Sequence, residues 1–352
     1  MVIGRNEQGA TLMTDKIRPF VDVHSDFLMD VIEQRAYGQK HVIEDEWVPG
    51  MRTAGINIRV LALYVDEKLV PEMALHRGMQ MVSALLSEEK ESPSIKICRN
   101  YSDIEEALAQ NKIGMILAFE GVEPLLNDLR LLPVFHELGV RIMSLTHSRR
   151  NFAADGAPYF PDKAGTLGGL TEFGSQLVRD AGDLSMLMDV THINDIGFWE
   201  VMDIVKGPVI ATHSNCRALC DHPRNFTDEM IKAVADRGGV MGVLHFCFGS
   251  LDGTNHTVEH ILNHLDHMVK VGGIECAGFG FDFYEYLLKN LSPEEHQRLP
   301  IDLTKKVAGN DLTKDEDVPL LLKGLEKRGY TENEIDLLLG GNFLRLFKSV
   351  WD

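Results

Sequence analysis

The chain has 352 residues, of which 44% are hydrophobic and 25% are charged, and its formal net charge is −18. This length and hydrophobic content are sufficient for a large buried core. The negative charge opposes binding to phosphate backbones and anionic lipids, so we expect neither nucleic-acid nor membrane partners. The five scattered cysteines do not resemble a disulfide framework, and they predict a reducing, cytoplasmic location.

The N-terminal segment carries charges but no apolar run of signal-peptide length. No stretch approaches the ~18–20 apolar residues that a membrane-spanning helix needs. We expect residues 1–16 to form a flexible extension, and residues 17–352 to form a single catalytic domain that ends in helices.

Eight short segments predict buried strands, because they are rich in Val, Ile, Leu and Met and almost continuously apolar. In chain order they are Phe20–Val23, Ile56–Val65, Gly114–Phe119, Arg141–Thr146, Met186–Thr191, Pro208–Thr212, Val240–Leu244 and Ala277–Phe281. Helical patterns with capping residues lie between the strands and after the last one. These helices are expected over Asp103–Asn111 with Ser102 as its cap, Thr171–Ala181, Asn194–Val205, Thr227–Arg237, Thr257–Val271, Leu320–Glu326 and Glu332–Trp351.

The alternation of strands and helices predicts parallel strands joined by helical crossovers. About eight such units have the usual size of an α/β protein with a (β/α)8 barrel. A doubly wound open sheet is the alternative. It is disfavoured because VDVHSDF stands where a glycine-rich phosphate loop would follow the first strand.

Five of the apolar runs end in a side chain of the kind that binds metals. They are Val21–Asp26, Met115–Glu120, Met186–His192, Val209–His213 and Ala277–Asp282. The carboxyl ends of parallel barrel strands meet at one face, so three histidines and three carboxylates are expected to converge there. This pattern predicts a metallohydrolase with two metal ions.

The spacing of these residues suggests how they share the metals. His24 and Asp26 lie two apart on one strand face and can reach one ion, and an imidazole with a carboxylate suits zinc. His192 and His213 end consecutive predicted strands. Glu120 has two oxygens and can bridge two cations; the alternative is an ion pair with an arginine at the barrel mouth.

Two further residues suggest roles in catalysis and binding. Asp282 is placed to accept a proton from a metal-bound water and return it to a leaving amine, although it could instead only orient other groups. Arg224 presents a planar fork that suits a substrate carboxylate. The alternative is a surface arginine paired with Asp221 or Asp228.

A stripe of four histidines at helical spacing has a different interpretation. It lacks the Glu of an H-E-x-x-H motif, so we expect it to form a solvated helix face. The stripe consists of His256, His260, His264 and His267.

Several longer stretches together resemble the membrane (renal) dipeptidase family of zinc dipeptidases, in its bacterial, unanchored form. They run from about Asp22 to Asp282 in the expected order, and a C-terminal stretch also fits. The stretches are VDVHSD, AFEGVEPLLNDLRLLPVFHELGVRIMSLTHSRRNFAADG, GLTEFG, DVTHINDIGFWEV, PVIATHSNCRALCDHPRN, RGGVMGV, GFGFDF and ENEIDLLLGGNFLRLF.

The resemblance implies a (β/α)8 barrel of the metallo-dependent hydrolase type with two zinc ions per chain. It implies that His24 and Asp26 bind one zinc ion and that His192 and His213 bind the other. Glu120 would bridge the two ions and thereby take part in catalysis.

The resemblance also assigns residues to the substrate. It implies that His147 binds the carbonyl oxygen as it becomes an oxyanion, that Arg224 holds the terminal carboxylate, and that Asp282 handles the proton. The implied reaction is hydrolysis of dipeptides by a zinc-activated hydroxide, with a D-residue tolerated at the C-terminal position. A homodimer would be usual for the family.

Two departures from the family pattern lie near the expected barrel mouth, at Leu244–Phe246 and Phe283–Glu285. These departures do not alter the predicted metal ligands, but they lie where they would affect which substrate is bound. They motivate a second hypothesis, a deacylase of N-acyl amino acids on the same metal site. A third hypothesis is a catalytically silent barrel that only binds a ligand, and the complete ligand set argues against it.

Overall fold

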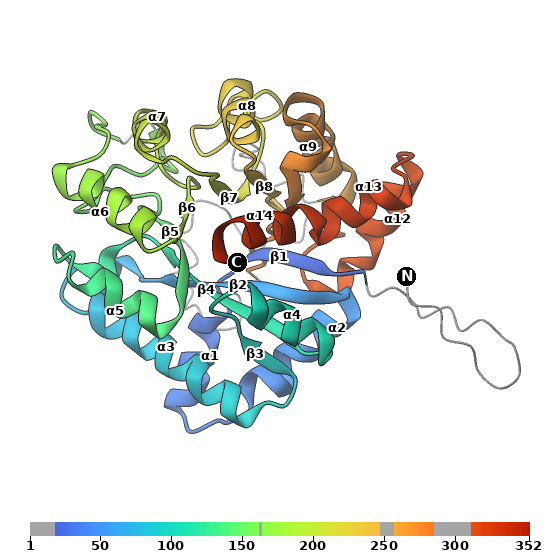
Figure 1. The fold of residues 1–352 in the computed structure, drawn as a ribbon, viewed down its shortest axis with the longest axis horizontal. Coiled ribbons are helices and arrows are strands. Elements are labelled where there is room, and N and C mark those ends of the chain that lie inside the picture. The colour runs from blue at the N-terminus through green and yellow to red at the C-terminus, as the bar shows by residue number, and fades with distance from the viewer. Residues whose placement is uncertain (1–17, 162–163, 247–256, 285–310) are drawn as a thin grey trace, which may run out of the picture.

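The computed structural model describes residues 18–161, 164–246, 257–284 and 311–352, and the predicted N-terminal extension lies outside these ranges. In the described residues, parallel strands form one sheet that closes into a barrel, and helices surround it (Figure 1). The strands are β1 (Phe20–Ser25), β2 (Ile56–Tyr64), β3 (Ile95–Ile97), β4 (Ile113–Glu120), β5 (Val140–Ser144), β6 (Leu187–Asp189), β7 (Ile210–Ser214), β8 (Val240–Val243) and β9 (Ala277–Phe279).

The pairing order of the strands confirms the predicted barrel. The sheet runs β2-β1-β9-β8-β7-β6-β5-β4-β3, and β2 also pairs with β4, which closes a ring of eight strands. The remaining strand, β3, pairs with the start of β4, where Ile95 lies opposite Ile113, whereas β5 pairs with its end, where Val140 lies opposite Leu117. The doubly wound alternative is therefore wrong. The sequence did not indicate β3, because three residues are too few to carry a pattern.

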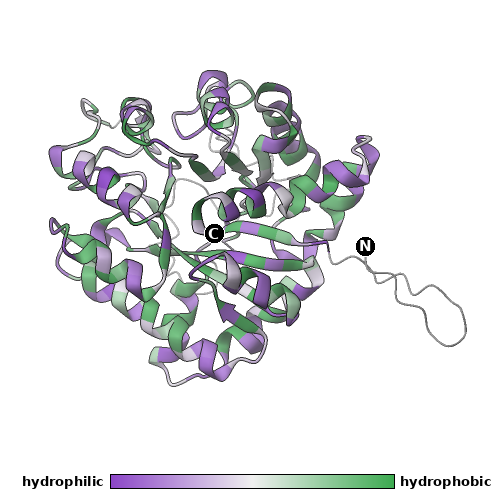
Figure 2. Cartoon of the chain, viewed as in Figure 1, coloured by the Kyte–Doolittle hydropathy of each residue, from purple (hydrophilic) through white to green (hydrophobic). Residues whose placement is uncertain are grey.

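Helices cover the outside of the barrel, and Figure 2 shows their outward faces to be largely hydrophilic while the strands are hydrophobic. The helices are α1 (Leu28–Ala36), α2 (Val48–Ala54), α3 (Ala74–Glu91), α4 (Tyr101–Ala109), α5 (Leu131–Leu138), α6 (Glu172–Asp183), α7 (Asp195–Ile204), α8 (Asp228–Asp236), α9 (Val258–Gly272), α12 (Pro319–Lys327), α13 (Glu332–Asp336) and α14 (Asn342–Trp351).

Side-chain caps fix the beginnings of several helices, as the sequence predicted. In each, the cap side chain accepts a backbone N–H of the first turn. These caps are Thr171 for α6, Asn194 for α7, Thr227 for α8 and Thr257 for α9. The predicted cap of α4 is wrong: Asn100, not Ser102, accepts the N–H of Asp103, because Ser102 already lies within the helix.

The C-terminal helical region closes the barrel at the end where the strands begin. The predicted helix Glu332–Trp351 is divided into α13, a π-helical turn at Leu337–Gly341, and α14. Phe343 and Phe347 of α14 pack with the residues that fill the barrel interior. The opposite end, where the strands finish, is thereby left for the site. A capping box between Thr331 and Glu334 begins α13.

The histidine stripe of α9 is not the solvated face that the sequence predicted. His264 is fully buried, and its Nδ1 accepts the backbone N–H of Cys216 at 3.1 Å. His267 lies 2.7 Å from a carboxylate oxygen of Asp228, and His256 falls outside the described residues. The prediction failed because α9 packs against α8 and the loop after β7, which turns the stripe inward.

Of the helices in the described part of the chain, none combines the length and apolarity that crossing a bilayer requires.

Candidate metal centre

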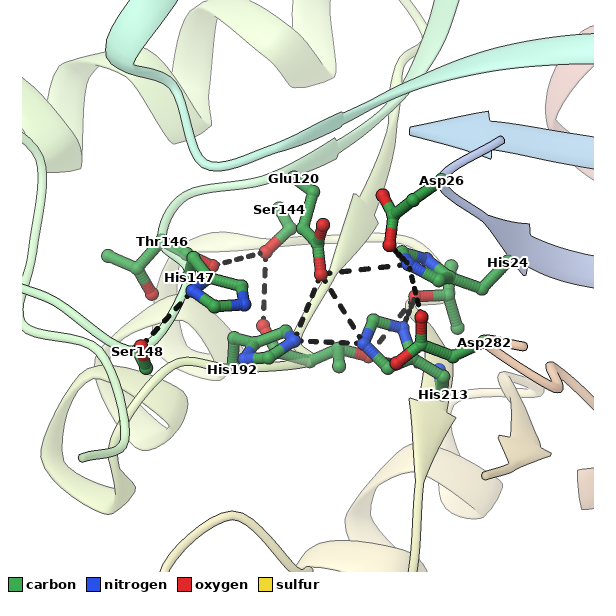
Figure 3. A network of polar contacts seen from close by, with 12 residues as sticks. His24, Asp26, Glu120, Ser144, Thr146, His147, Ser148, His192, His213 and Asp282 are labelled. Atoms are coloured by element: carbon green, nitrogen blue, oxygen red, sulfur yellow. Dashed lines mark hydrogen bonds and ion pairs between the residues drawn. The ribbon is translucent and has the colours of Figure 1, made fainter. Parts of the chain in front are cut away.

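The carboxyl ends of the barrel strands gather all six predicted strand-end residues (Figure 3). Three overlapping sets of ligand atoms lie close enough together to hold a metal ion. The sets are His24 with His213 and Asp282; Glu120 with His147 and His192; and His24 with Asp26 and Glu120.

One set is centred on the imidazole of His24. Its Nε2 atom lies 3.6 Å from Asp26 Oδ2, 3.6 Å from Glu120 Oε1 and 3.7 Å from Asp282 Oδ1. Among the described residues, this buried nitrogen has no hydrogen-bond partner. Two atoms bound at about 2.1 Å to a tetrahedral cation lie ~3.4 Å apart. The spacing therefore fits ligands that share a cation better than it fits direct hydrogen bonds.

A second group of close contacts joins Glu120 to two histidines, of which His192 follows β6 and His213 lies in β7. His192 Nε2 is 3.0 Å from Glu120 Oε1 and 2.8 Å from His213 Nε2. His213 Nε2 is 3.5 Å from the same Glu120 oxygen. Glu120 thus lies between this pair and His24, where it could serve two cations. The predicted alternative, in which Glu120 pairs with an arginine, is not needed to account for its surroundings.

A buried carboxylate sets the tautomer of His213. Thr212 donates its hydroxyl to Asp189 Oδ2 at 2.6 Å, so its oxygen is left to accept the Nδ1–H of His213 at 3.0 Å. The proton on Nδ1 leaves the Nε2 lone pair directed toward Glu120. In histidines that bind metals, a hydrogen bond of this kind to the ring nitrogen that does not bind the metal orients the imidazole. Asp189 also accepts the backbone N–H of Thr191, which secures the end of β6.

Asp22, within β1, is a second buried carboxylate that holds backbone near the site. Its Oδ1 atom accepts the N–H groups of His24, at 3.4 Å, and of Phe281, at 2.9 Å. Burial raises the pKa of Asp22 to about 6, against the opposing charge of Arg59. No role of Asp22 or Asp189 was predicted from the sequence. Their importance could have been inferred because each is a carboxylate in an otherwise apolar run, shortly before a predicted metal ligand.

Backbone conformation turns two of the site residues toward the barrel mouth. His192 and Asp282 have φ angles of 67° and 56°, in the left-handed region that residues other than glycine rarely adopt. Such strain concentrates at functional sites, where the surrounding structure holds it in place. Gly121, directly after Glu120, has a φ of 87°, which glycine adopts without this cost.

The electrostatics of the cluster favour a bound cation. Burial raises the pKa values of Glu120 and Asp282 well above their usual range, and neighbouring carboxylates act in the same direction. Burial lowers the pKa values of His192 and His213 far enough to keep them neutral. For His24, burial is outweighed by the adjacent carboxylates, which raise its pKa to about 10. Divalent cations would compensate this concentration of buried carboxylates.

His147 lies beside the cluster, after β5. Its ring centroid is 4.4 Å from that of His192. The hydroxyl oxygen of Tyr159 lies 2.8 Å from its Nε2, and Ser148 Oγ lies 3.1 Å from its Nδ1. Burial lowers the pKa of His147, so the imidazole is neutral. Tyr159 was missed in the sequence because it stands in a long irregular loop without periodicity.

Arg224 is buried, so its predicted alternative as a surface arginine is wrong. Its Nη2 donates to the carbonyl of His213 at 2.7 Å and lies 3.1 Å from His192 Nε2. Its Nη1 donates to Ser214 Oγ at 3.3 Å. The guanidinium is therefore at the edge of the cluster, where a carboxylate could reach it.

The departures from the family pattern bring aromatic rings together near Asp282. In the segment Leu244–Phe246, the ring of His245 has its centroid 5.0 Å from that of Phe283 and 4.9 Å from that of Tyr284. Phe246 and Phe283 are both buried. Glu285 lies outside the described residues.

A closed parallel barrel with histidines and carboxylates at its carboxyl end defines a metallo-dependent hydrolase. The family model described as "Membrane dipeptidase (Peptidase family M19)" matches residues 8–352. The chain therefore belongs to this family of metal-dependent dipeptidases, which confirms the resemblance seen in the sequence.

Known proteins and solved structures are similar to the chain over most of its length. The uncharacterized protein in the pqqA 5′ region of Klebsiella pneumoniae is 31% identical over 73% of this chain and 89% of its own length. The structure of dipeptidase AC, a metallo peptidase of family M19, superposes with a TM-score of 0.81 at 25% identity, over 96% of this chain and 99% of that one. The structure of a metallo peptidase from Rhodobacter sphaeroides, liganded with a phosphinate mimic of L-Ala-D-Ala, superposes with a TM-score of 0.81 at 24% identity, over 95% of this chain and 99% of that one.

Proposed function

We propose that this protein hydrolyses the peptide bond of dipeptides that have a free C-terminal carboxylate, with two zinc ions as cofactors. The position of Glu120 carries this proposal. Its Oε1 atom lies 3.0 Å from His192 Nε2 and 3.6 Å from His24 Nε2, and so lies between two sets of metal-type ligands.

The proposed ligand assignment follows these distances. His24 and Asp26 would hold one ion, His192 and His213 would hold the other, and Glu120 would be shared between them. When bound, two divalent cations would lower the pKa of a water molecule and polarise the scissile carbonyl group.

The remaining polar groups serve the reacting atoms. His147 donates a hydrogen bond to the carbonyl oxygen as negative charge develops there. It does so as a neutral imidazole, because burial lowers its pKa. Asp282 accepts a proton from the attacking water and returns it to the leaving amine nitrogen. Burial raises the pKa of Asp282, which suits a group that must both take and release a proton.

Arg224 binds the substrate carboxylate and so restricts the substrate to one residue beyond the scissile bond. Arginine can form two parallel hydrogen bonds with a carboxylate, and burial strengthens such a contact. A D-residue at this position is part of the proposal. The phosphinate mimic of L-Ala-D-Ala held by the Rhodobacter sphaeroides protein supports it.

We also infer a cytoplasmic homodimer whose residues 17–352 form one catalytic domain. Among the residues that the structure describes, Cys98, Cys216 and Cys276 are buried free thiols, as expected in a reducing compartment.

The proposal is tested by metal analysis and a substrate panel. Purified protein should contain about two zinc ions per chain and should cleave L,L- or L,D-dipeptides but not their C-terminal amides. Failure to bind zinc under metal-replete conditions would contradict the proposed cofactor. Equal rates on free and amidated dipeptides would remove the role assigned to Arg224.

A second candidate is the deacylation of N-acyl amino acids, favoured by the aromatic rings around His245 near the barrel mouth. Adding N-acyl amino acids to the same panel distinguishes the two. A larger kcat/KM for these compounds than for every dipeptide would replace the dipeptidase proposal.

A further inference from the structure

Tyr159 enters the site from the loop between β5 and α6. Its hydroxyl lies 2.8 Å from His147 Nε2, and its ring centroid is 5.3 Å from that of the imidazole. Burial raises the pKa of Tyr159 well above its usual value, so the hydroxyl keeps its proton. A neutral hydroxyl at this distance can accept a hydrogen bond and donate another.

The loop is docked closely on the two histidine segments. The backbone N–H of Ala157 donates to the carbonyl of His192 at 2.6 Å, and that of Gly156 donates to the carbonyl of Arg149 at 3.2 Å. A Cβ atom on Gly156 would lie 1.9 Å from the carbonyl oxygen of His147. Glycine is therefore required for the loop to approach the site this closely.

A buried carboxylate holds the loop in this position. Asp155 accepts from Arg150 Nη2 and from the backbone N–H of Gly168, both at 2.6 Å. Its own carbonyl accepts the N–H of Asn194 at 3.2 Å. Tyr159 is thus presented by a supported loop rather than by a chance surface contact.

Tyr159 is also connected to the segment of Arg224. The backbone N–H of Arg224 donates to His222 Nδ1 at 3.2 Å, which leaves the proton of this imidazole on Nε2. That Nε2 donates in turn to the carbonyl oxygen of Tyr159 at 3.3 Å. The same residue therefore contacts the proposed oxyanion donor through its side chain, and through its backbone it contacts His222, which accepts the N–H of the proposed carboxylate clamp.

Two arrangements of protons are open to His147. Either Ser148 donates to Nδ1 and Nε2–H donates to Tyr159, or Nδ1–H donates to Ser148 and Tyr159 donates to Nε2. Only the first places an N–H on Nε2, the nitrogen that contacts Tyr159 and that Figure 3 shows on the side of the ring toward Glu120, away from Ser148.

We propose that Tyr159 is a positioning residue for His147: before the reaction its hydroxyl oxygen accepts the Nε2–H and so holds the imidazole in the tautomer and orientation from which this N–H turns to the oxyanion as negative charge develops. This inference rests on the proposed function, because it assumes the oxyanion role of His147. Its effect belongs to the transition state, since the substrate gains a full negative charge on that oxygen only there.

The substitution Tyr159→Phe tests the proposal, because it removes the hydroxyl and keeps the ring. We expect kcat to fall about 10- to 100-fold, as when a donor to an oxyanion is lost or misplaced, while KM and zinc content stay unchanged. The inhibition constant of a phosphinate dipeptide mimic should rise by the same factor as kcat/KM falls. A kcat within about twofold of the parent enzyme would overturn the proposal.

A matched control is Tyr330→Phe, which also removes a tyrosine hydroxyl bonded to a side chain. The hydroxyl of Tyr330, which follows α12, donates to Asp266 of α9 at 2.8 Å. This substitution should leave kcat unchanged. If Tyr159→Phe does not fold, Ser148→Ala is the second variant. It removes the donor to Nδ1 and should likewise lower kcat without raising KM.

The tautomer can be measured without turnover. In protein labelled with ¹⁵N-histidine, with the signals assigned by His147→Gln, the ring of His147 should show a protonated Nε2 and an unprotonated Nδ1. A protonated Nδ1 overturns the inference. A parent enzyme that shows this tautomer but cleaves no dipeptide instead contradicts the proposed function, so the two failures are distinguishable.

Discussion

Asp282 shows how burial and close neighbours set the properties of a single residue. Its carboxylate lies 3.7 Å from His24 Nε2, and burial together with the charge of Asp26 raises its pKa. It stands outside the bridging position of Glu120, at the side of the cluster. We therefore assign it to proton transfer, whereas Glu120 is assigned to the metals.

This assignment predicts the behaviour of Asp282→Asn. The amide cannot accept the proton, so kcat should fall at least about 100-fold, while the zinc content stays that of the parent enzyme. Turnover and zinc analysis on the same sample provide the measurement. Loss of zinc together with activity would show that Asp282 is a ligand.

His264 predicts a dependence of stability on pH. Burial lowers its pKa to about 3, so between pH 6.5 and pH 3 the unfolded chain binds a proton at this position that the folded protein does not bind. Its contribution to the free energy of unfolding is therefore complete above pH 6.5 and decreases as the pH falls toward 3.

The substitution His264→Gln removes this titration. Between pH 7 and pH 5 the parent protein should lose about 2 kcal/mol of stability relative to the variant. Urea denaturation at both pH values gives the two free energies. Parallel changes in the two proteins would show that His264 does not couple folding to protonation.

Among the elements, the loop between β5 and α6 positions more of the site than its irregular sequence suggests. It carries Tyr159, folds back on the carbonyl group of its own Arg149 and docks on the carbonyl group of His192. Its approach depends on Gly156, because a side chain there would meet the backbone of His147.

Replacement of this glycine should separate the loop from the site. In Gly156→Ala the backbone must shift, and we expect stability to fall by about 1–3 kcal/mol and kcat to fall about tenfold or more. Gly165→Ala, in the same loop, is the control, because its Cβ would meet nothing within 4 Å. Equal activity of the two variants would contradict this account.

For the whole molecule, one end of the barrel is closed by α14 and the other is occupied by the site. Phe343 of α14 is fully buried among the residues of the barrel interior, and its ring is so close to Gly278 that a Cβ there would lie 2.3 Å away. Asn342 donates to the carbonyl of Ala277 at 2.8 Å and so joins the helix to β9. The C-terminus thus supports the strands that end in ligands.

This arrangement predicts a large stability loss for Phe343→Ala. Truncation leaves a cavity at the base of the barrel and should cost about 3–5 kcal/mol. Lys348→Ala, on the exposed side of the same helix, should cost less than about 1 kcal/mol. Chemical denaturation measures both, and similar losses would show that α14 does not serve as part of the core.

The sequence predicted the strands that form the closed ring, because buried parallel strands have continuous apolar runs. It also predicted that His24, Asp26, Glu120, His192 and His213 converge, since strand ends of a barrel share one face. It could not predict the burial of His264, because helical spacing shows which residues share a face but not what covers that face.

The sequence by itself determined the barrel, the family and the metal-binding residue types at the strand ends, because each follows from local patterns of apolarity and residue type. Only the tertiary structure decided which groups complete the site. Asp189 sets the tautomer of His213, and Tyr159 reaches His147 from a loop. Such contacts join residues that no periodicity relates, and they form only when the closed barrel brings the strand ends and the loop together.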